Sequence, residues 1–179
     1  TLTTAPSSGC LAAGDDVIII NLQGTSTSYD NGGQYEMLTV DGVAGLVVTF
    51  TTNKQKYYGD NIGDDTNIGT GTGAQRVMLQ RVPNYTNFTV NSGVNAYPSD
   101  WNGVKGGVFA IKATGAISAN GTIHANGKGY RGGGSSGAWN GGYGGEAFTK
   151  TQAGGMGGYY ACDAGSAGTA GGGGGGGAR

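Results

Sequence analysis

The chain has 179 residues, of which 41 are glycine, 12% are charged and 36% are apolar. Glycine is roughly three times as frequent as its usual ~7%, and a formal net charge of −1 gives no reason to expect nucleic acid or an anionic lipid surface as a partner. No apolar run approaches the ~20 residues that span a bilayer, so no membrane span is expected. Because Thr1 follows no signal peptide and the last residue is Arg179, we expect a trimmed part of a longer secreted chain.

Residues 1–80 are predicted to form a β-rich region. The apolar run DVIIINL at 16–22 predicts a buried strand, and QYEMLTV at 34–40 alternates as a half-buried strand does. After an expected turn at Asp41-Gly42, the β-branched run at 46–52 predicts a third strand. No sustained apolar period of 3.6 residues is present, so almost no helix is expected.

A second hairpin is expected between residues 54–58 and 75–82, across a polar loop at 59–73. This loop contains the sequence DNIGDDTN, whose oxygen donors are typical of calcium ligands in extracellular proteins. The candidate ligands are Asp60, Asp64, Asp65 and Asn67. The loop lacks the spacing and the terminal glutamate of an EF-hand, so a solvated acidic loop is the alternative. The sequence suggests no other cofactor.

Residues 81–126 are predicted to form a module of short strands. The segments FTVNSG, VFAIKATG, AISANG and TIHANG each end in glycine or Asn-Gly. This rhythm favours stacked turns of a β-solenoid or a tight meander, with a short-strand β-sandwich as the alternative. Three Asn-X-Thr sequons, at Asn84, Asn87 and Asn120, are candidates for glycosylation in a secreted chain, although such triplets also arise by chance.

Residues 127–179 contain 23 of the glycines, and small residues recur at every third position from Gly129 to Ala147. A period of three is typical of a polyproline-II-type helix, whose buried backbone groups must find partners in neighbouring helices. The chain has only three prolines, which excludes collagen. The region is therefore predicted to form a polyglycine-II bundle, with a disordered linker as the alternative.

The stretch RVPNYTNFTVNSG…WNGVKGGVFAIKATGAISANGTIHANGKGYRGGG, residues 81–134, resembles a module of large secreted bacterial surface proteins and phage-associated fibre proteins. In these, a short β-rich lead-in precedes a glycine-rich region. Residues 127–179 resemble the polyglycine-II sandwich of phage long-tail-fibre tip adhesins and the glycine-rich regions of some receptor ectodomains. The resemblance implies an extracellular, cell-surface or virion location. It also implies receptor contacts at the connecting loops, here residues 148–152 and 159–163.

Aromatic residues gather in or beside the glycine-rich region, where they either pack over it or form a contact surface. They are Tyr130, Trp139, Tyr143, Phe148, Tyr159 and Tyr160. The two cysteines, Cys10 and Cys162, have no CxxC spacing and make a metal site improbable. We predict a disulfide between them in an oxidising compartment, with two free thiols as the alternative; closing a loop of about 150 residues would contribute roughly 4–5 kcal/mol.

No catalytic constellation is visible in the sequence. The single histidine, His124, has no acid or nucleophile nearby, and the adjacent carboxylates Asp15 and Asp16 would point apart. We therefore expect a non-enzymatic extracellular structural protein, a subunit or fragment of a surface fibre that forms homo-oligomers or filaments through strand edges and the glycine-rich bundle. The alternative is an adhesin that binds a glycan or a surface receptor.

Overall fold

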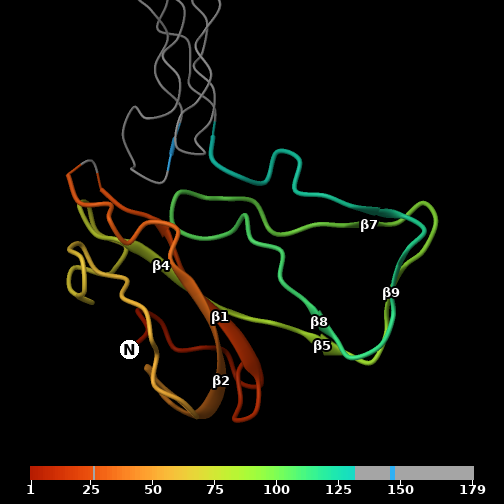
Figure 1. Ribbon diagram of the computed structural model, residues 1–179, viewed down its shortest axis with the longest axis horizontal. Coiled ribbons are helices and arrows are strands. Elements are labelled where there is room, and N and C mark those ends of the chain that lie inside the picture. Colours follow the sequence, from red (N-terminus) through yellow and green to blue (C-terminus); the bar gives the residue numbers. More distant parts are fainter. Residues whose placement is uncertain (26, 132–145, 148–179) are drawn as a thin grey trace, which may run out of the picture.

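The computed structural model describes residues 1–25, 27–131 and 146–147. These residues form ten strands and no helix, which confirms the predicted all-β class for this part of the chain. Figure 1 shows two parts, a curled sheet built by β1, β2 and β4 and an extended group of short strands that includes β5, β7, β8 and β9. The predicted polyglycine-II bundle lies mostly outside the described residues and stays a prediction.

The sheet is antiparallel, with the strand order β3-β2-β1-β4. Its bounds are β1 (Asp16–Gln23), β2 (Tyr35–Ala44), β3 (Val47–Phe50) and β4 (Arg76–Arg81). Val17 of β1 lies opposite Leu38 of β2, and these two side chains form the buried core with Val40. The apolar run at 16–22 thus becomes the central strand because it can be covered by a partner on each edge.

Two expectations for this region are wrong. β2 runs through Asp41-Gly42 with a register shift between Val40 and Gly42, because a bulge absorbs one residue and bends the strand without ending it; the turn falls at Gly45, whose φ is 58°. Residues 54–58 form no strand, and β4 pairs with β1 instead. Alternation identifies a strand and its buried face, but does not identify its partner.

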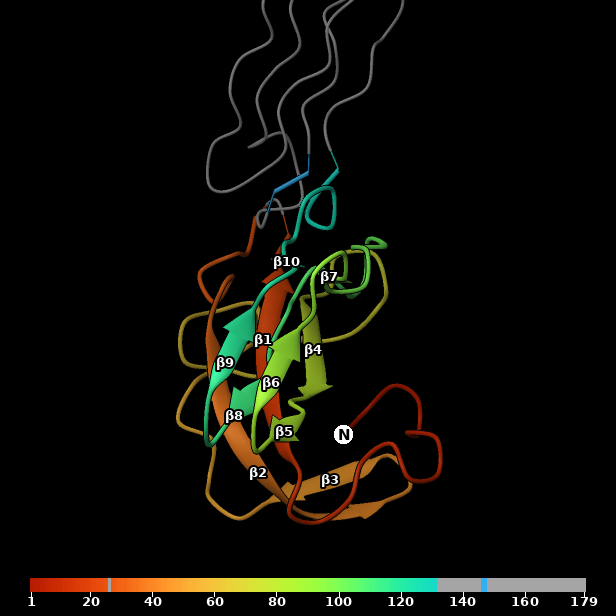
Figure 2. The same ribbon diagram turned by 90° about the vertical axis from the view of Figure 1, so that its right-hand side faces the viewer.

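The short strands form two stacked turns of chain. The first turn contains β5 (Asn84–Tyr85), β6 (Phe88–Val90) and β7 (Asn95–Ala96), and the second contains β8 (Lys112–Ala113), β9 (Ile117–Ala119) and β10 (Thr122–Ile123). Each strand of the second turn is parallel to its counterpart in the first, in the pairs β5–β8, β6–β9 and β7–β10. Figure 2 shows β6 beside β9. We call these two turns, residues 83–131, the coil.

Two glycines allow the turns of the coil to approach closely. A Cβ atom on Gly121 would lie 2.3 Å from the carbonyl oxygens of both Asn91 and Val94, and one on Gly115 would lie 2.7 Å from the carbonyl oxygen of Thr86. Side chains do not fit at such distances from backbone atoms. The glycines that end the segments ATG and SANG are therefore required by the stacking itself.

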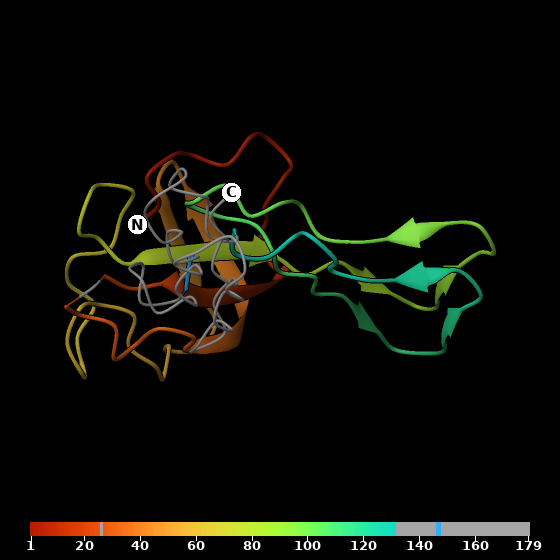
Figure 3. The ribbon, with the colours of Figure 1, turned by 90° about the horizontal axis from the view of Figure 1, so that it is seen from above.

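Asp16, at the start of β1, connects the sheet to the coil. Its Oδ2 accepts hydrogen bonds from Lys112 Nζ at 2.7 Å and from Asn84 Nδ2 at 3.1 Å, and its Oδ1 accepts one from Thr39 at 3.0 Å. The bond from Lys112, followed by those from Asn84 and Thr39, lowers the pKa of Asp16. The coil projects to one side of the sheet (Figure 3). The predicted division at residues 80 and 81 falls at the end of β4 and stays a prediction.

Candidate anchoring site at the entrance to the glycine-rich region

Glu146 lies against Arg131 and Trp101, although all the residues between Arg131 and Glu146 lie outside the described part. The Glu146 carboxylate accepts hydrogen bonds from Trp101 Nε1 at 2.9 Å, from the Arg131 backbone N–H at 3.0 Å and from Arg131 Nε at 3.0 Å. Arg131 Nη2 binds the other oxygen as an ion pair, and the Glu146 N–H donates to the Arg131 carbonyl at 2.9 Å. Arg131 and Glu146 are therefore joined side by side.

The same group of residues is attached to the last residues of β1. Ala147 is fully buried, and its carbonyl accepts a hydrogen bond from Gln23 Nε2 at 2.7 Å. The Tyr130 hydroxyl donates to the Leu22 carbonyl, and its ring meets Trp101 edge-on with centroids 5.5 Å apart. We call the set of Trp101, Tyr130, Arg131, Glu146 and Ala147 the Glu146 anchor.

Charge and burial keep the anchor in one protonation state at neutral pH. Burial alone would raise the pKa of Glu146, but the hydrogen bonds from Arg131 and Trp101 outweigh it, so the pKa lies below its ordinary value. Burial, with a smaller contribution from the Glu146 charge, raises the pKa of Tyr130 to about 12. Glu146 therefore stays ionised while Tyr130 keeps the proton it donates to Leu22.

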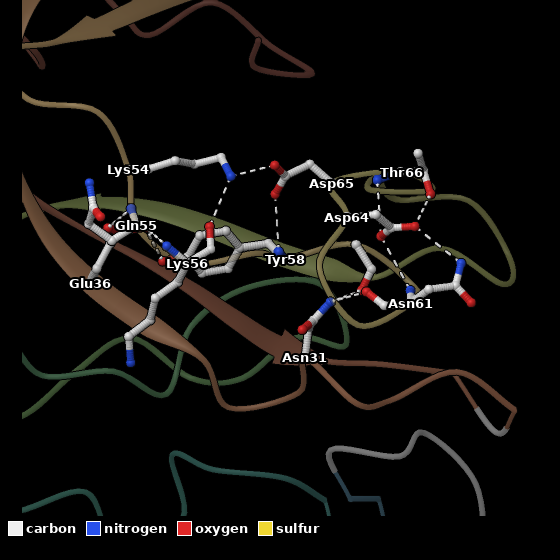
Figure 4. Close-up of polar contacts among 11 residues, drawn as sticks. Asn31, Glu36, Lys54, Gln55, Lys56, Tyr58, Asn61, Asp64, Asp65 and Thr66 are labelled. Atoms are coloured by element: carbon white, nitrogen blue, oxygen red, sulfur yellow. Dashed lines mark hydrogen bonds and ion pairs between the residues drawn. The ribbon is translucent and has the colours of Figure 1, made fainter.

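The acidic loop at 59–67 is held by its own hydrogen bonds (Figure 4). Asp64 Oδ2 accepts from Thr66 Oγ1 at 2.8 Å and from Asn61 Nδ2 at 3.1 Å. Asp60 Oδ1 lies 2.9 Å from the same Thr66 hydroxyl oxygen, whose single proton is donated to one of the two carboxylates at a time, and Asp60 Oδ2 accepts from Asn67 Nδ2 at 3.1 Å. Hydrogen bonds from Asn61 and Thr66 lower the pKa of Asp64, so this carboxylate remains charged within a set of internal donors.

The third aspartate of the loop has a different partner. Asp65 forms an ion pair with Lys54 and accepts a hydrogen bond from the Tyr58 backbone N–H at 3.1 Å. Within the described ranges, no group of three or more histidine, cysteine or acidic side chains is placed to hold a metal ion. The calcium site stays a prediction, as does its alternative, a solvated acidic loop.

Buried polar residues fasten this loop to the sheet. Tyr58 is fully buried; its hydroxyl donates to Glu36 at 2.8 Å and its carbonyl accepts from Asn21 Nδ2 at 3.1 Å. Asn21 also donates to Gln75 Oε1 at 2.8 Å, and Asn31 donates to the Gly59 carbonyl at 3.0 Å. Side-chain amides thus provide the partners that the loop backbone needs where water is excluded.

The three sequons all lie on the coil and are exposed. The amide nitrogen of Asn84, which would carry a glycan, is engaged with Asp16. Asn87 instead accepts a hydrogen bond through Oδ1, from the Ala116 N–H at 2.8 Å, and this bond does not use its amide nitrogen. Of these two sites, Asn87 therefore has the better geometry for glycosylation, which itself stays a prediction.

The remaining predicted residues lie in different places. Cys10 is exposed and forms no disulfide with a described residue, and because Cys162 lies outside the described residues, the disulfide stays a prediction. Tyr130 belongs to the anchor. The other five aromatic candidates lie outside the described residues; they are Trp139, Tyr143, Phe148, Tyr159 and Tyr160. His124 stacks on Tyr97 within the coil, with ring centroids 5.4 Å apart.

Sequence reasoning missed the central residues of the anchor, Trp101 and Glu146. Each is an isolated large or charged residue among glycines and small polar residues, and that isolation was the available signal. It also missed Asn21 and Gln23, which interrupt the apolar run of β1 and are both buried. A polar residue inside a buried strand indicates a specific partner elsewhere in the chain.

A shallow groove of about 420 Å³ lies between the end of β4 and the first turn of the coil. The residues that line it include Gln80, Arg81, Tyr85, Asn95, Tyr97 and Phe109. Sequence reasoning placed no site here, because these residues come together only when the coil forms.

No protein-family model matches the chain, and neither do any curated protein or any solved structure. Within the described ranges there is also no helical segment with the length and hydrophobicity of a membrane span.

Proposed function

We propose that the chain is a non-enzymatic extracellular structural protein, a subunit or fragment of a cell-surface fibre. The observation that carries this proposal is the Glu146 anchor, which joins both ends of a glycine-rich segment to the end of β1. The anchor uses a charged, multiply hydrogen-bonded carboxylate and a fully buried alanine, contacts that hold a neighbouring segment in a fixed position. The β part thus acts as the base from which the predicted polyglycine-II bundle begins.

Strand edges of the coil supply the assembly surface of this proposal. The coil corresponds to two turns of a short solenoid, and each of its strands is paired on one side only among the described residues. Ile117 and Ile123 of the second turn are 57% and 40% exposed. Unpaired edges beside exposed apolar side chains favour pairing with another chain.

Electron microscopy of the purified protein at native ionic strength tests the proposal. We expect filaments, and we expect Ile117→Lys to abolish them because a charge beside the strand edge opposes pairing. Ile62→Lys is the matched control, since Ile62 is 82% exposed in the acidic loop. Compact particles at every concentration, or filaments that Ile117→Lys leaves intact, would contradict assembly through this edge.

The second candidate function is that of an adhesin that binds a glycan or a surface receptor. It is favoured by the groove beside the coil, where tyrosine and phenylalanine rings lie next to amide side chains. Such a combination of apolar surface with a few polar groups is typical of binding sites for small ligands.

A further inference from the structure

Tyr97 presents a fixed aromatic surface at the groove. It directly follows β7, and the register that pairs Ile123 with Ala96 places His124 beside Tyr97 in the next turn. The two rings stack with an interplanar angle of 30°, and Lys128 Nζ lies 4.6 Å from the Tyr97 ring centroid. Tyr97 nevertheless remains 53% exposed. His124 and Lys128 thus hold the ring from within the coil, and the exposed part of the residue is what a ligand can reach.

The polar groups of the groove favour a neutral ligand. Arg81 is the only charged residue among those described that line it, and its Nε is paired with Asp15 Oδ1 at 2.8 Å. The Lys128 ammonium over the Tyr97 ring is likewise paired, with Asp100 Oδ1 at 2.6 Å. The other hydrogen-bonding side chains include the amides of Gln80 and Asn95. Each amide offers both donors and an acceptor, a combination that matches hydroxyl groups better than carboxylates or phosphates.

The shape of the groove also favours a sugar over a peptide strand. Six of the lining residues, Pro98, Ser99 and 108–111, form no strand, so they offer no regular backbone edge for strand addition. Tyr85 provides a second aromatic residue that is partly exposed, at 40%. Rings for the apolar faces of pyranoses and amides for their hydroxyls are thus present in one open groove.

We propose that this groove binds a neutral oligosaccharide, with one sugar ring packed against the exposed part of Tyr97 and hydroxyl groups hydrogen-bonded to Gln80 and Asn95. The inference rests on the second candidate function and assigns it a place on the coil. It does not depend on fibre assembly.

Binding of neutral oligosaccharides by the whole protein tests the inference. Maltohexaose, cellohexaose and mannohexaose would be titrated separately and followed by calorimetry and by amide chemical shifts. We expect at least one of them to bind, with shifts concentrated at residues 80–85 and 95–99. Tyr97→Ala should weaken binding roughly three- to tenfold, as expected for the loss of one aromatic contact, whereas Tyr97→Phe should retain it.

Two further variants separate a local effect from loss of the fold. Asn95→Ala removes a proposed hydrogen bond without removing a ring, and should also weaken binding. Tyr57→Ala is the matched control, because Tyr57 is 49% exposed and does not line the groove. Circular dichroism of each variant would show whether the β-structure is retained.

The outcomes distinguish the groove from the broader function. Binding that survives both Tyr97→Ala and Asn95→Ala would overturn the groove assignment and leave glycan adhesion standing. Failure of the wild-type protein to bind any of the three oligosaccharides at millimolar concentration would overturn both the groove assignment and glycan adhesion. A concentration-dependent dimer lost in Tyr97→Ala, without saccharide binding, would assign the groove to a second copy of the chain.

Discussion

At the scale of single residues, Glu146 makes more contacts than an isolated charged residue among glycines would be expected to make. Its carboxylate has one oxygen shared by Trp101 and Arg131 and the other paired with Arg131. Because Arg131 is 64% exposed at its side chain, solvent screens the ion pair. The position of Glu146 is therefore fixed largely by the contacts of the buried residues Trp101 and Ala147.

The anchor is expected to weaken in acid. The pKa of Glu146 is lowered below its ordinary value of 4.5, so its contribution is fully present above that value and is lost as the pH falls through the folded-state pKa. Trp101 fluorescence, recorded against pH in a Trp139→Phe background, should change below about pH 4.5 as the indole loses its charged acceptor. A signal that stays flat down to the acid unfolding of the sheet would contradict this assignment.

Glu146→Gln is the variant that isolates the charge. Glutamine can still accept the Trp101 hydrogen bond but cannot pair with Arg131 as an ion, so we expect a loss of about 1 kcal/mol of unfolding free energy at pH 7. The acid-dependent change of Trp101 fluorescence should disappear in this variant. Its persistence would assign the pH dependence to another carboxylate, such as Asp16.

Tyr58 gives a further prediction at the scale of single residues. Removing its hydroxyl in Tyr58→Phe breaks the 2.8 Å hydrogen bond to Glu36 in a residue that is fully buried, which should lower the unfolding free energy by about 1 kcal/mol. Urea denaturation would measure the difference. Tyr57→Phe alters the exposed neighbour and should change stability by less than about 0.5 kcal/mol; equal effects in the two variants would contradict the role of Tyr58.

At the scale of elements, the stacking of the coil depends on close backbone contact at its glycines. A methyl group in Gly121→Ala would meet the carbonyl oxygens of Asn91 and Val94 at 2.3 Å, and neither is a flexible side chain that could move away. We expect a loss at the upper end of the roughly 1–3 kcal/mol typical of overpacking, with faster amide exchange in β6 and β9.

Gly71→Ala is the matched control for this prediction. A Cβ at Gly71 would meet no atom within 4 Å, so its effect on the unfolding free energy should stay within about 0.5 kcal/mol. If both variants unfold at the same urea concentration, the two turns of the coil cannot be packed as closely as the structure has them.

At the scale of the whole molecule, what could be predicted depends on how far apart the interacting residues lie. The strands at 16–22 and 34–40 are visible because their own apolar residues determine their burial. The partner of β4 is not visible in the sequence, because the pairing of β4 with β1 is decided by the rest of the sheet. The strands of the coil are too short to show a period, and the contact of Glu146 with Trp101 joins two isolated residues. Local patterns therefore specified the elements, while long-range contacts decided the site.

The disulfide predicted between Cys10 and Cys162 is also a property of the whole chain, because it would tie the start of the β part to the glycine-rich region. Cys10 is exposed, so its thiol is open to a partner and to reagents alike. We expect the non-reduced protein to resist alkylation at Cys10, and reduction to lower the unfolding free energy by about 4–5 kcal/mol. Cys10→Ser should reproduce the reduced state and be insensitive to reductant. Full alkylation of Cys10 in the native, non-reduced protein would show that Cys10 forms no disulfide and would overturn this prediction.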